Sequence, residues 1–440
     1  MNKEMLDLCN WIMDETLKNG ASDCKVSLNK RRIVEINYRK QKPESIKEAT
    51  TRSLSLDVYL DGKFAVQSTP DLRKTSLETF IKKACENAKY IEADPYRTLP
   101  GKDLIKGKQD IDLELYDNRV KDFAPDLKHK MVQEIEEACI NKGGDKVISV
   151  EAGAEFSEDE NLEVASNGLV NSTQKTSVWI GASMAAQDEG DRRPNGYHWA
   201  GARYLNDLPK TSDVGIKAAE RTLELLGGKK MPTEKLPVII ENRVANRLLN
   251  GFIAGMNGGN IQQQRSFLAD KKGEVVASPK LSLIDDPFVK KGFGSRLVDG
   301  DGLPARKRIM LDQGKVEEFF IDWYYSRKME CQPTTGGASN LILKPGEKSL
   351  EDLMKDTGRG ILVTGFIGGN SNSTTGDFSI GIIGHLFENG VPVQAIAEMN
   401  IADNHLEFWK KLADVGNDPW KYSSWNIPSL LFDDIVVAGV

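Results

Sequence analysis

Two short stretches, NGASDCKVSL (residues 19–28) and KGGDKVISV (residues 142–150), share a pattern that sets the expected fold of the N-terminal half. Each passes from glycine through aspartate into alternating apolar and polar residues, which is typical of a half-buried β-strand. Each also follows a segment with apolar residues at helical spacing, at residues 3–18 and at about residues 126–141. The repeated pattern predicts that one structural unit occurs twice.

Further strands follow each of the two stretches. The strand at residues 53–60 turns at Asp61-Gly62, and the strand at residues 161–166 turns at Asn167-Gly168. Both dipeptides tolerate positive φ in two-residue hairpins. We therefore expect antiparallel hairpins in both copies.

A helix is expected to close each copy. The first begins at TSLE (residues 75–78), which has the pattern of a capping box, and the second covers residues 211–228. The N-terminal half is predicted to be one α+β domain, residues 1–230. Its two copies, residues 1–100 and 122–228, each contain a helix, antiparallel strands and a helix.

The C-terminal half, residues 236–440, is predicted to be a second α+β domain that is rich in strands and glycine-containing hairpins. Apolar spacing predicts helices at about residues 242–256 and 404–415, and SLED (residues 349–352) has the pattern of a capping box. Helices and hairpins alternate here without a regular βαβ rhythm, which favours α+β over a doubly wound sheet.

Composition narrows the class of protein. The chain has 440 residues, a net charge of -6 and five cysteines in scattered positions. The negative charge argues against a nucleic-acid partner, and no apolar run is long enough for a membrane helix. The odd, scattered cysteines favour a reducing compartment, so we expect a soluble cytoplasmic protein.

The stretch TTGDFSIGIIGHLFENG (residues 374–390) contains four glycines but no phosphate-binding pattern. It is interpreted as a strand that enters a tight turn at Asn389-Gly390 and returns as a second strand. Its glycines are expected to mark bulges or close approach of another backbone.

The histidines do not form a metal-binding motif. Their spacing nowhere gives His-Glu-x-x-His. A site that combines Asp377, His385 and His405 is one open possibility from the residues alone. A chain without a self-evident active site is the other.

An ordered set of motifs is similar to the TldD/PmbA family, also called modulators of DNA gyrase or peptidase family U62. The similarity covers nearly the whole chain, and the motifs are, in order, SDCKVSL (22–28), DPY (94–96), SFLAD (266–270), Asp301-Gly302-x-Pro304, YYSRKM (324–329), PTTGG (333–337), TGDFSIGIIGHLFENG (375–390) and VGND (415–418).

The resemblance also points to one branch of the family. The TldD branch carries His-Glu-x-x-x-His on the first helix of its C-terminal domain and a zinc-binding cysteine near its C-terminus. Here Leu249, Asn250 and Ala254 occupy the corresponding positions, give or take one residue, and the last 18 residues contain no cysteine. The resemblance therefore implies the PmbA/TldE branch, with no metal in this chain and zinc in a TldD-type partner.

Membership of that branch would make the chain the non-catalytic subunit of a dimeric metalloprotease that cuts unfolded or flexible peptides. We expect it to be inactive alone. A homo-oligomeric peptide-binding or scaffold protein and a peptidase with a displaced site remain alternatives. Strand addition of the peptide along residues 378–385 is one hypothesis for binding. The polar side chains expected to line the substrate site are Arg265, Asn372, Asp377 and His385.

Overall fold

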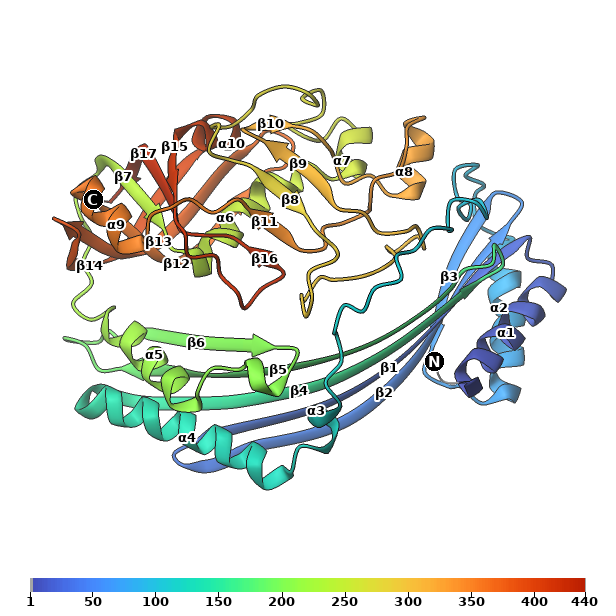
Figure 1. Ribbon diagram of the computed structural model, residues 1–440, viewed down its shortest axis with the longest axis horizontal. Helices are drawn as coiled ribbons and strands as arrows, with labels where there is room; N and C mark the ends of the chain where they lie inside the picture. Colours follow the sequence, from blue (N-terminus) through green and yellow to red (C-terminus); the bar gives the residue numbers. More distant parts are fainter. Residues whose placement is uncertain (1–2, 440) are drawn as a thin grey trace.

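The computed structural model of the protein describes residues 3–439, and its N-terminal half is built on a six-stranded antiparallel sheet (Figure 1). The strand order is β3-β2-β1-β4-β5-β6, so β1 and β4 form the central pair. The elements of this half are α1 (Lys3–Lys18), β1 (Asp23–Arg39), β2 (Lys42–Leu60), β3 (Lys63–Thr69), α2 (Lys74–Ala88), α3 (Asn118–Asp122), α4 (Pro125–Gly143), β4 (Val147–Ala165), β5 (Val170–Ala186), β6 (Asn195–Ala202) and α5 (Thr211–Leu223).

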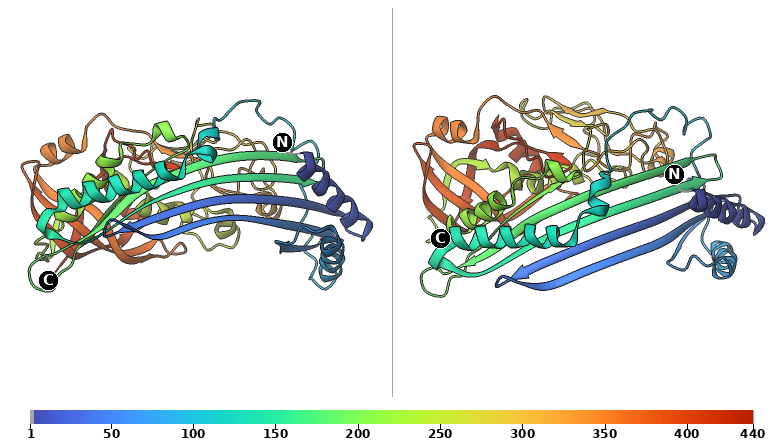
Figure 2. Two further views of the ribbon diagram at one scale, coloured as in Figure 1. Left: turned by 90° about the horizontal axis from the view of Figure 1, so that it is seen from below. Right: turned by 60° about the horizontal axis from the view of Figure 1, so that its bottom comes forward.

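The expected repeat is visible in this element order. A helix, a three-stranded antiparallel meander and a helix occur twice, as α1-β1-β2-β3-α2 and as α4-β4-β5-β6-α5. The two meanders join through the antiparallel β1–β4 pair. The four long strands curve along the length of the molecule, with α1 and α2 at one end and α4 running toward the other (Figure 2).

Two separate cores lie under the two helix pairs. Val26 and Leu28 of β1 pack in the core that contains α1 and α2, whereas Val34 and Ile36 of the same strand pack in the core that contains α4 and α5. Between these cores the strand carries Arg32, which pairs with Glu48 and Glu158. One strand therefore serves two apolar clusters through a charged middle section.

The tip of the β1–β2 hairpin is held by a tertiary contact. Lys40 and Gln41 both have positive φ, at 54° and 58°. The backbone N–H of Gln41 donates to both carboxylate oxygens of Glu136, at 3.0 and 3.1 Å. Because Glu136 is buried on α4, this contact fixes a turn that has no glycine.

The C-terminal half contains a closed barrel and a smaller sheet. Strands β14, β13, β12, β7, β17 and β15 form one sheet, and pairing of β14 with β17 closes it; β10, β9, β8, β11 and β16 form the other. The elements are β7 (Glu234–Ile240), α6 (Asn242–Ala254), α7 (Gly258–Gln262), β8 (Leu283–Asp285), β9 (Arg308–Asp312), β10 (Lys315–Val316), α8 (Trp323–Lys328), β11 (Leu341–Leu343), α9 (Leu350–Thr357), β12 (Arg359–Ser371), β13 (Asp377–Glu388), β14 (Val391–Asn404), α10 (His405–Phe408), β15 (Leu412–Val415), β16 (Trp425–Asn426) and β17 (Leu430–Ala438).

Several local predictions are confirmed. Asn389 and Gly390 have φ of 51° and 79° and form the turn between β13 and β14. Ser349 and Asp352 form the capping box of α9. A Cβ added at Gly384 would lie 1.9 Å from the carbonyl oxygen of Leu362, so this glycine does mark close approach of a neighbouring backbone.

Three local predictions are wrong. The segment at 404–415 forms only a short helix, His405–Phe408, a 3-10 turn and then β15, because Leu412 and Val415 pair with β17. The helix α2 begins at Lys74, with Arg73 as its N-cap residue and no side-chain cap, so TSLE is not a capping box. Residues 378–385 cannot add a peptide strand, because β13 is paired with β12 on one side and β14 on the other.

The two halves meet along β5, β6 and α5. The Trp179 ring stacks on Phe293 at a centroid distance of 5.1 Å, and His198 of β6 lies edge-on to Trp420 at 6.0 Å. Within residues 3–439, none of the helices is both long enough and apolar enough to cross a lipid bilayer.

Candidate functional site

The helix α6 is the first helix of the C-terminal half, and its start is fixed by residues near the end of the chain. The backbone N–H of Asn242 donates to Ser429 Oγ at 3.1 Å, and the Asn242 amide donates to the carbonyl of Asp418 at 2.6 Å. Ser429 in turn donates to Asp418 Oδ2 at 2.8 Å. The Asp of the VGND motif therefore anchors the first turn of α6, where helix N–H groups lack intrahelical acceptors.

One face of α6 packs in the core and another borders a cavity. Leu249 and Phe252 are fully buried, as apolar residues at helical spacing should be. The cavity has a volume of about 180 Å³, and we call it the α6 cavity. Its lining includes Arg247, Asn250, Gly251, Ser371, Phe378 and His405.

Gly251 creates the space at the centre of this cavity. A Cβ at this position would lie 2.6 Å from His405 Nε2 and 3.0 Å from Ser371 Oγ. Glycine inside a helix costs about 1 kcal/mol relative to alanine, so it is unusual without a reason. Here the reason is room for the His405–Ser371 pair.

His405 lies in an aromatic shell beside Ser371. Its ring stacks on Phe378 at a centroid distance of 4.7 Å and on Phe267 at 5.6 Å. Nε2 lies 2.9 Å from Ser371 Oγ, and Nδ1 lies 3.3 Å from Trp409 Nε1. Both ring nitrogens of His405 therefore have partners.

These partners determine the proton positions. An indole N–H can only donate, so Nδ1 of His405 accepts from Trp409 and carries no proton. Burial lowers the pKa of His405 to about 4. At neutral pH the ring is uncharged, and its proton sits on Nε2 and is donated to Ser371 Oγ.

Ser371 is consequently not an activated nucleophile. A serine nucleophile needs a neighbouring base that accepts its proton, and His405 instead donates to Ser371. The hydroxyl hydrogen of Ser371 stays available for another acceptor, and the amide of Asn250 is exposed. The α6 cavity can thus form neutral hydrogen bonds but has no charged base.

The donor set along α6 does not fit zinc. Leu249 and Ala254 have no donor atom, and Asn250 offers only a neutral amide. The Nε2 of His405, the nearby imidazole nitrogen, carries a proton and cannot ligate in that state. Among residues 3–439, no three His, Cys, Asp or Glu side chains come close enough together to hold a metal ion. We derive no hydrolytic step from this site.

Three of the sequence-predicted lining residues come together at the β12–β13 loop. The Thr374 hydroxyl lies 3.5 Å from the carbonyl of Arg265, and Gly376 N–H donates to the carbonyl of Asn372 at 2.8 Å. Asp377 accepts from Asn404 Nδ2 at 2.9 Å. Hydrogen bonds from Asn404 and Thr375 lower the pKa of Asp377. Because Asn404 directly precedes His405, this loop lies against the segment that lines the α6 cavity.

His385 lies elsewhere. Its Nε2 is 2.7 Å from the carbonyl oxygen of Glu224, at the C-terminal end of α5. It is eight positions from Asp377 along β13, or about 26 Å in an extended strand. Asp377, His385 and His405 are therefore not brought together, and His385 connects the two halves of the molecule instead.

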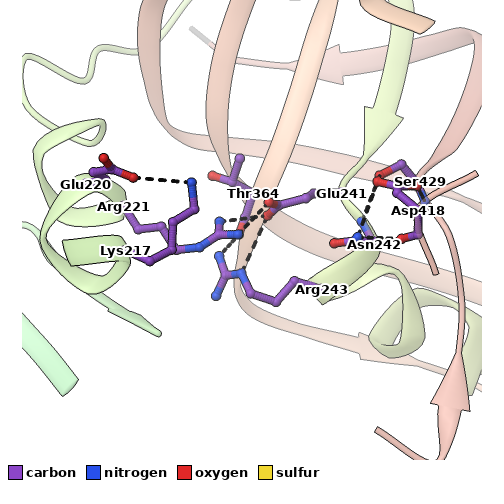
Figure 3. A network of polar contacts seen from close by, with 9 residues as sticks. All are labelled: Lys217, Glu220, Arg221, Glu241, Asn242, Arg243, Thr364, Asp418 and Ser429. Atoms are coloured by element: carbon purple, nitrogen blue, oxygen red, sulfur yellow. Dashed lines mark hydrogen bonds and ion pairs between the residues drawn. The ribbon is translucent and has the colours of Figure 1, made fainter. Parts of the chain in front are cut away.

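Sequence reasoning missed a charged cluster between α5 and α6. Glu241, just before α6, accepts from Arg221 Nη2 at 2.7 Å and from Arg221 Nη1 at 3.0 Å, and Arg243 Nε lies 3.5 Å from it (Figure 3). The side chains of Arg221 and Glu241 are only 10% and 11% exposed. The one signal in the sequence is the spacing of Arg243 and Arg247, which puts two guanidinium groups on one face of α6.

The chain matches three domain models of one family. Residues 24–88 match domain 1 of the PmbA/TldA metallopeptidases, residues 118–226 match the central domain, and residues 233–439 match the C-terminal domain. These matches cover most of both predicted halves.

Relatives and solved structures agree with these matches. Metalloprotease PmbA of Escherichia coli O157:H7 is 27% identical over 428 residues, which is 96% of this chain and 94% of that protein. The crystal structure of a candidate modulator of DNA gyrase from Bacteroides thetaiotaomicron VPI-5482 is 37% identical and covers 100% of both chains with a TM-score of 0.97. TldE of Thermococcus kodakarensis has the same fold, with a TM-score of 0.85 at 19% identity over 99% of this chain and 100% of that one.

Proposed function

The chain belongs to the PmbA/TldD family of metallopeptidase-type proteins, and from this premise we propose that it is a metal-free subunit that binds flexible peptides for a zinc-bearing partner. The partner would be a TldD-type chain with His-Glu-x-x-x-His on the helix that corresponds to α6. That chain would supply the zinc and the hydrolytic step. This chain would bind and position the peptide.

The observation that carries the proposal is the composition of the α6 cavity. Apart from Arg247, its polar side chains, which include Ser371, Asn250 and the neutral His405, offer hydrogen bonds without charge. Peptide backbone groups need both donors and acceptors when they leave water. Gly251 leaves the open volume in which such a backbone could lie. A lining whose polar groups are mostly uncharged suits binding of many sequences rather than one.

The need for a partner follows from the same residues. Members of the family are named metallopeptidases, yet Leu249, Asn250 and Ala254 offer no ligand that suits zinc. Hydrolysis by a family-type zinc centre therefore requires a second chain.

A reducing compartment fits the cysteines, and we propose the cytoplasm. Burial raises the pKa of Cys9 to about 11 and that of Cys139 to about 12, so both thiols stay protonated. All five cysteines are free, and four of them are buried. Unpaired thiols of this kind are usual where disulfides do not persist.

The test is peptide hydrolysis by this chain, by a TldD-type chain and by their mixture. Oxidised insulin B chain is a suitable flexible substrate, and bound zinc is measured by elemental analysis. We expect cleavage by the mixture, with zinc recovered in the partner. Cleavage by this chain alone, or one zinc per molecule of this chain, would overturn the proposal.

A cavity variant tests the role of α6 directly. Gly251→Ala adds a methyl group against His405 and Ser371 and should weaken peptide binding in the complex. Gly101→Ala is the matched control, because a Cβ there meets no atom within 4 Å. If both variants bind the labelled B chain as the wild type does, peptides do not use the α6 cavity.

A further inference from the structure

A second cavity lies directly beside the first, at the junction of α5, β6, α6 and β12. Its volume is about 320 Å³, and we call it the arginine cleft. Arg221, Arg243 and Arg247 line it, together with Tyr197 and a single acidic residue, Glu224. Arg247 also lines the α6 cavity, so the two cavities are neighbours that share this side chain.

The charges around the cleft do not balance. Three guanidinium groups face one lining carboxylate, and Glu241 lies behind them as a second carboxylate bonded to Arg221. Three positive and two negative charges leave one positive charge in excess. Burial is the main cause that lowers the pKa of Arg243, and the neighbouring Arg221 lowers it further.

Several N–H groups of the cluster have no acceptor. The Nε atoms of Arg221 and Arg243 are buried and form no hydrogen bond, although Arg243 Nε lies 3.5 Å from the Glu241 carboxylate. Arg243 Nη2 donates to the carbonyl of Thr364 at 2.6 Å, but within the described part of the chain Nη1 has no hydrogen-bond acceptor. A buried donor without an acceptor costs about 1–3 kcal/mol, and more when it is charged.

The Arg243 guanidinium is also held in place. It lies over the Tyr197 ring, with the guanidinium carbon 5.1 Å from the ring centroid. Arg247 donates to the carbonyl of Phe366 at 3.3 Å and to that of Gly368. Both side chains therefore keep a fixed position before a ligand arrives, which lowers the entropy cost of binding.

We propose that the arginine cleft is a carboxylate-binding subsite that takes a negatively charged group of the peptide in the α6 cavity. This inference rests on the proposed function. A planar guanidinium pairs with a carboxylate through two parallel hydrogen bonds. One excess positive charge matches one carboxylate, which favours it over a doubly charged phosphate.

The carboxylate could be the C-terminus of the peptide or an acidic side chain, and three peptides separate these sources. All are decapeptides of glycine, serine and valine with an N-terminal dansyl label, which has no negative charge. One ends in a free carboxylate, one in an amide, and one in an amide with a penultimate glutamate. We expect at least one carboxylate peptide to bind the complex about tenfold more tightly than the neutral amide, equivalent to about 1.4 kcal/mol.

Substitutions test whether the arginine cleft causes the preference for a carboxylate peptide. Arg243→Gln and Arg247→Gln should each bring the affinities of the three peptides within about twofold of one another. Arg243→Lys keeps the charge but loses the two-bond geometry, and should retain only part of the preference. Lys217→Gln removes an equal charge from α5 outside the cleft lining and should leave the preference intact. Thermal unfolding checks that each variant folds.

The outcomes for the two proposals differ. Equal affinity for all three peptides in the wild type would overturn the carboxylate subsite and leave peptide binding standing. A carboxylate preference that survives both Gln variants would place it elsewhere and also overturn the subsite. No binding of any peptide would overturn the proposed function, and the subsite with it.

Discussion

The α6 cavity and the arginine cleft both border helix α6 and share the side chain of Arg247, but they differ in the charge and the hydrogen bonding of their polar groups. In the α6 cavity, both ring nitrogens of the uncharged His405 have partners, and Arg247 is the one charged side chain among the described residues of the lining. In the cleft, three arginines outnumber the carboxylates and buried N–H groups lack acceptors. A neutral network in which the hydrogen bonds are formed mainly holds side chains in place. A charged cluster with unpaired N–H groups can still bind an anion.

The two sites also differ in which parts of the chain provide their lining. The α6 cavity lies within the C-terminal half, where α6, β12, β13 and α10 provide its lining. The cleft joins α5 and β6 of the N-terminal half to α6 and β12. A change in the cleft should therefore affect the contact between the halves, and a change in the cavity should not.

The largest expected effect is from Glu241→Gln. It leaves the guanidinium groups of Arg221 and Arg243 buried without their shared anion, and breaking a buried ion pair costs about 3–5 kcal/mol. Glu220→Gln is the control, because Glu220 pairs at the surface with Lys142 and Lys217 and should cost less than about 1 kcal/mol. Denaturant unfolding measures both. Equal losses would mean that the cluster is not a buried ion pair.

The second prediction is a loss of folding stability in acid. It comes from two buried histidines, His405 in the α6 cavity and His198 near Arg221 and Arg243 of the cleft. Burial lowers the pKa of His405 and that of His198 from 6.5 to about 4, with Arg221 and Arg243 contributing at His198. Below pH 6.5 the unfolded chain takes up a proton at each site and the folded chain does not. Stability is therefore complete above pH 6.5 and falls toward pH 4, by about 3 kcal/mol for each histidine.

Urea unfolding between pH 7 and pH 4 tests this dependence. His405→Gln and His198→Gln should each reduce the slope of the unfolding free energy with pH, compared with the wild type. Carboxylates that titrate in the same range affect wild type and variants alike, so the difference isolates each histidine. An unchanged slope in either variant would show that its histidine is protonated in the folded state.

The third prediction concerns Gly251→Ala alone. Alanine gains about 1 kcal/mol in helix propensity but forces its methyl group to within 2.6 Å of His405 Nε2. Overpacking of this kind costs about 1–3 kcal/mol, so we expect a net loss of up to about 2 kcal/mol. Gly101→Ala should stay within about 0.5 kcal/mol of the wild type in the same unfolding assay. If Gly251→Ala were more stable than the wild type, His405 and Ser371 would have moved to make room for the methyl group at little cost.

The sequence alone predicted the α+β class, the repeated unit and the start of α6, because periodicity and turn dipeptides are local signals. The helix at residues 3–18 and the turn at Asn389-Gly390 are examples. It did not predict the full length of β1 and β2. Arg32 and its neighbours form a charged section that has no apolar alternation, and the Lys40-Gln41 turn depends on Glu136 from a distant helix.

The candidate site was predictable only in part, for the same reason. That Leu249, Asn250 and Ala254 bring no imidazole or carboxylate to α6 could be read directly, because they lie on one continuous helix. Ser371 and His405 meet only after β12 and β14 pair with β13, and no spacing links them. Arg221 and Glu241 are joined across the two halves. Contacts of this kind arise from packing of distant segments, so the periodicity of the sequence does not predict them.

The smallest expected effect separates the two sites most directly. Arg243→Gln removes one positive charge near His198 and should raise the pKa of His198, by less than about one pH unit. His405 should not respond, because the charge that acts on it is Asp403. The chain has four histidines, so selective labelling gives a simple NMR titration. If Arg243→Gln moves the pKa of His405 as much as that of His198, the charge of Arg243 acts equally on both sites. The division between a neutral positioning network and a charged binding cleft would then be wrong.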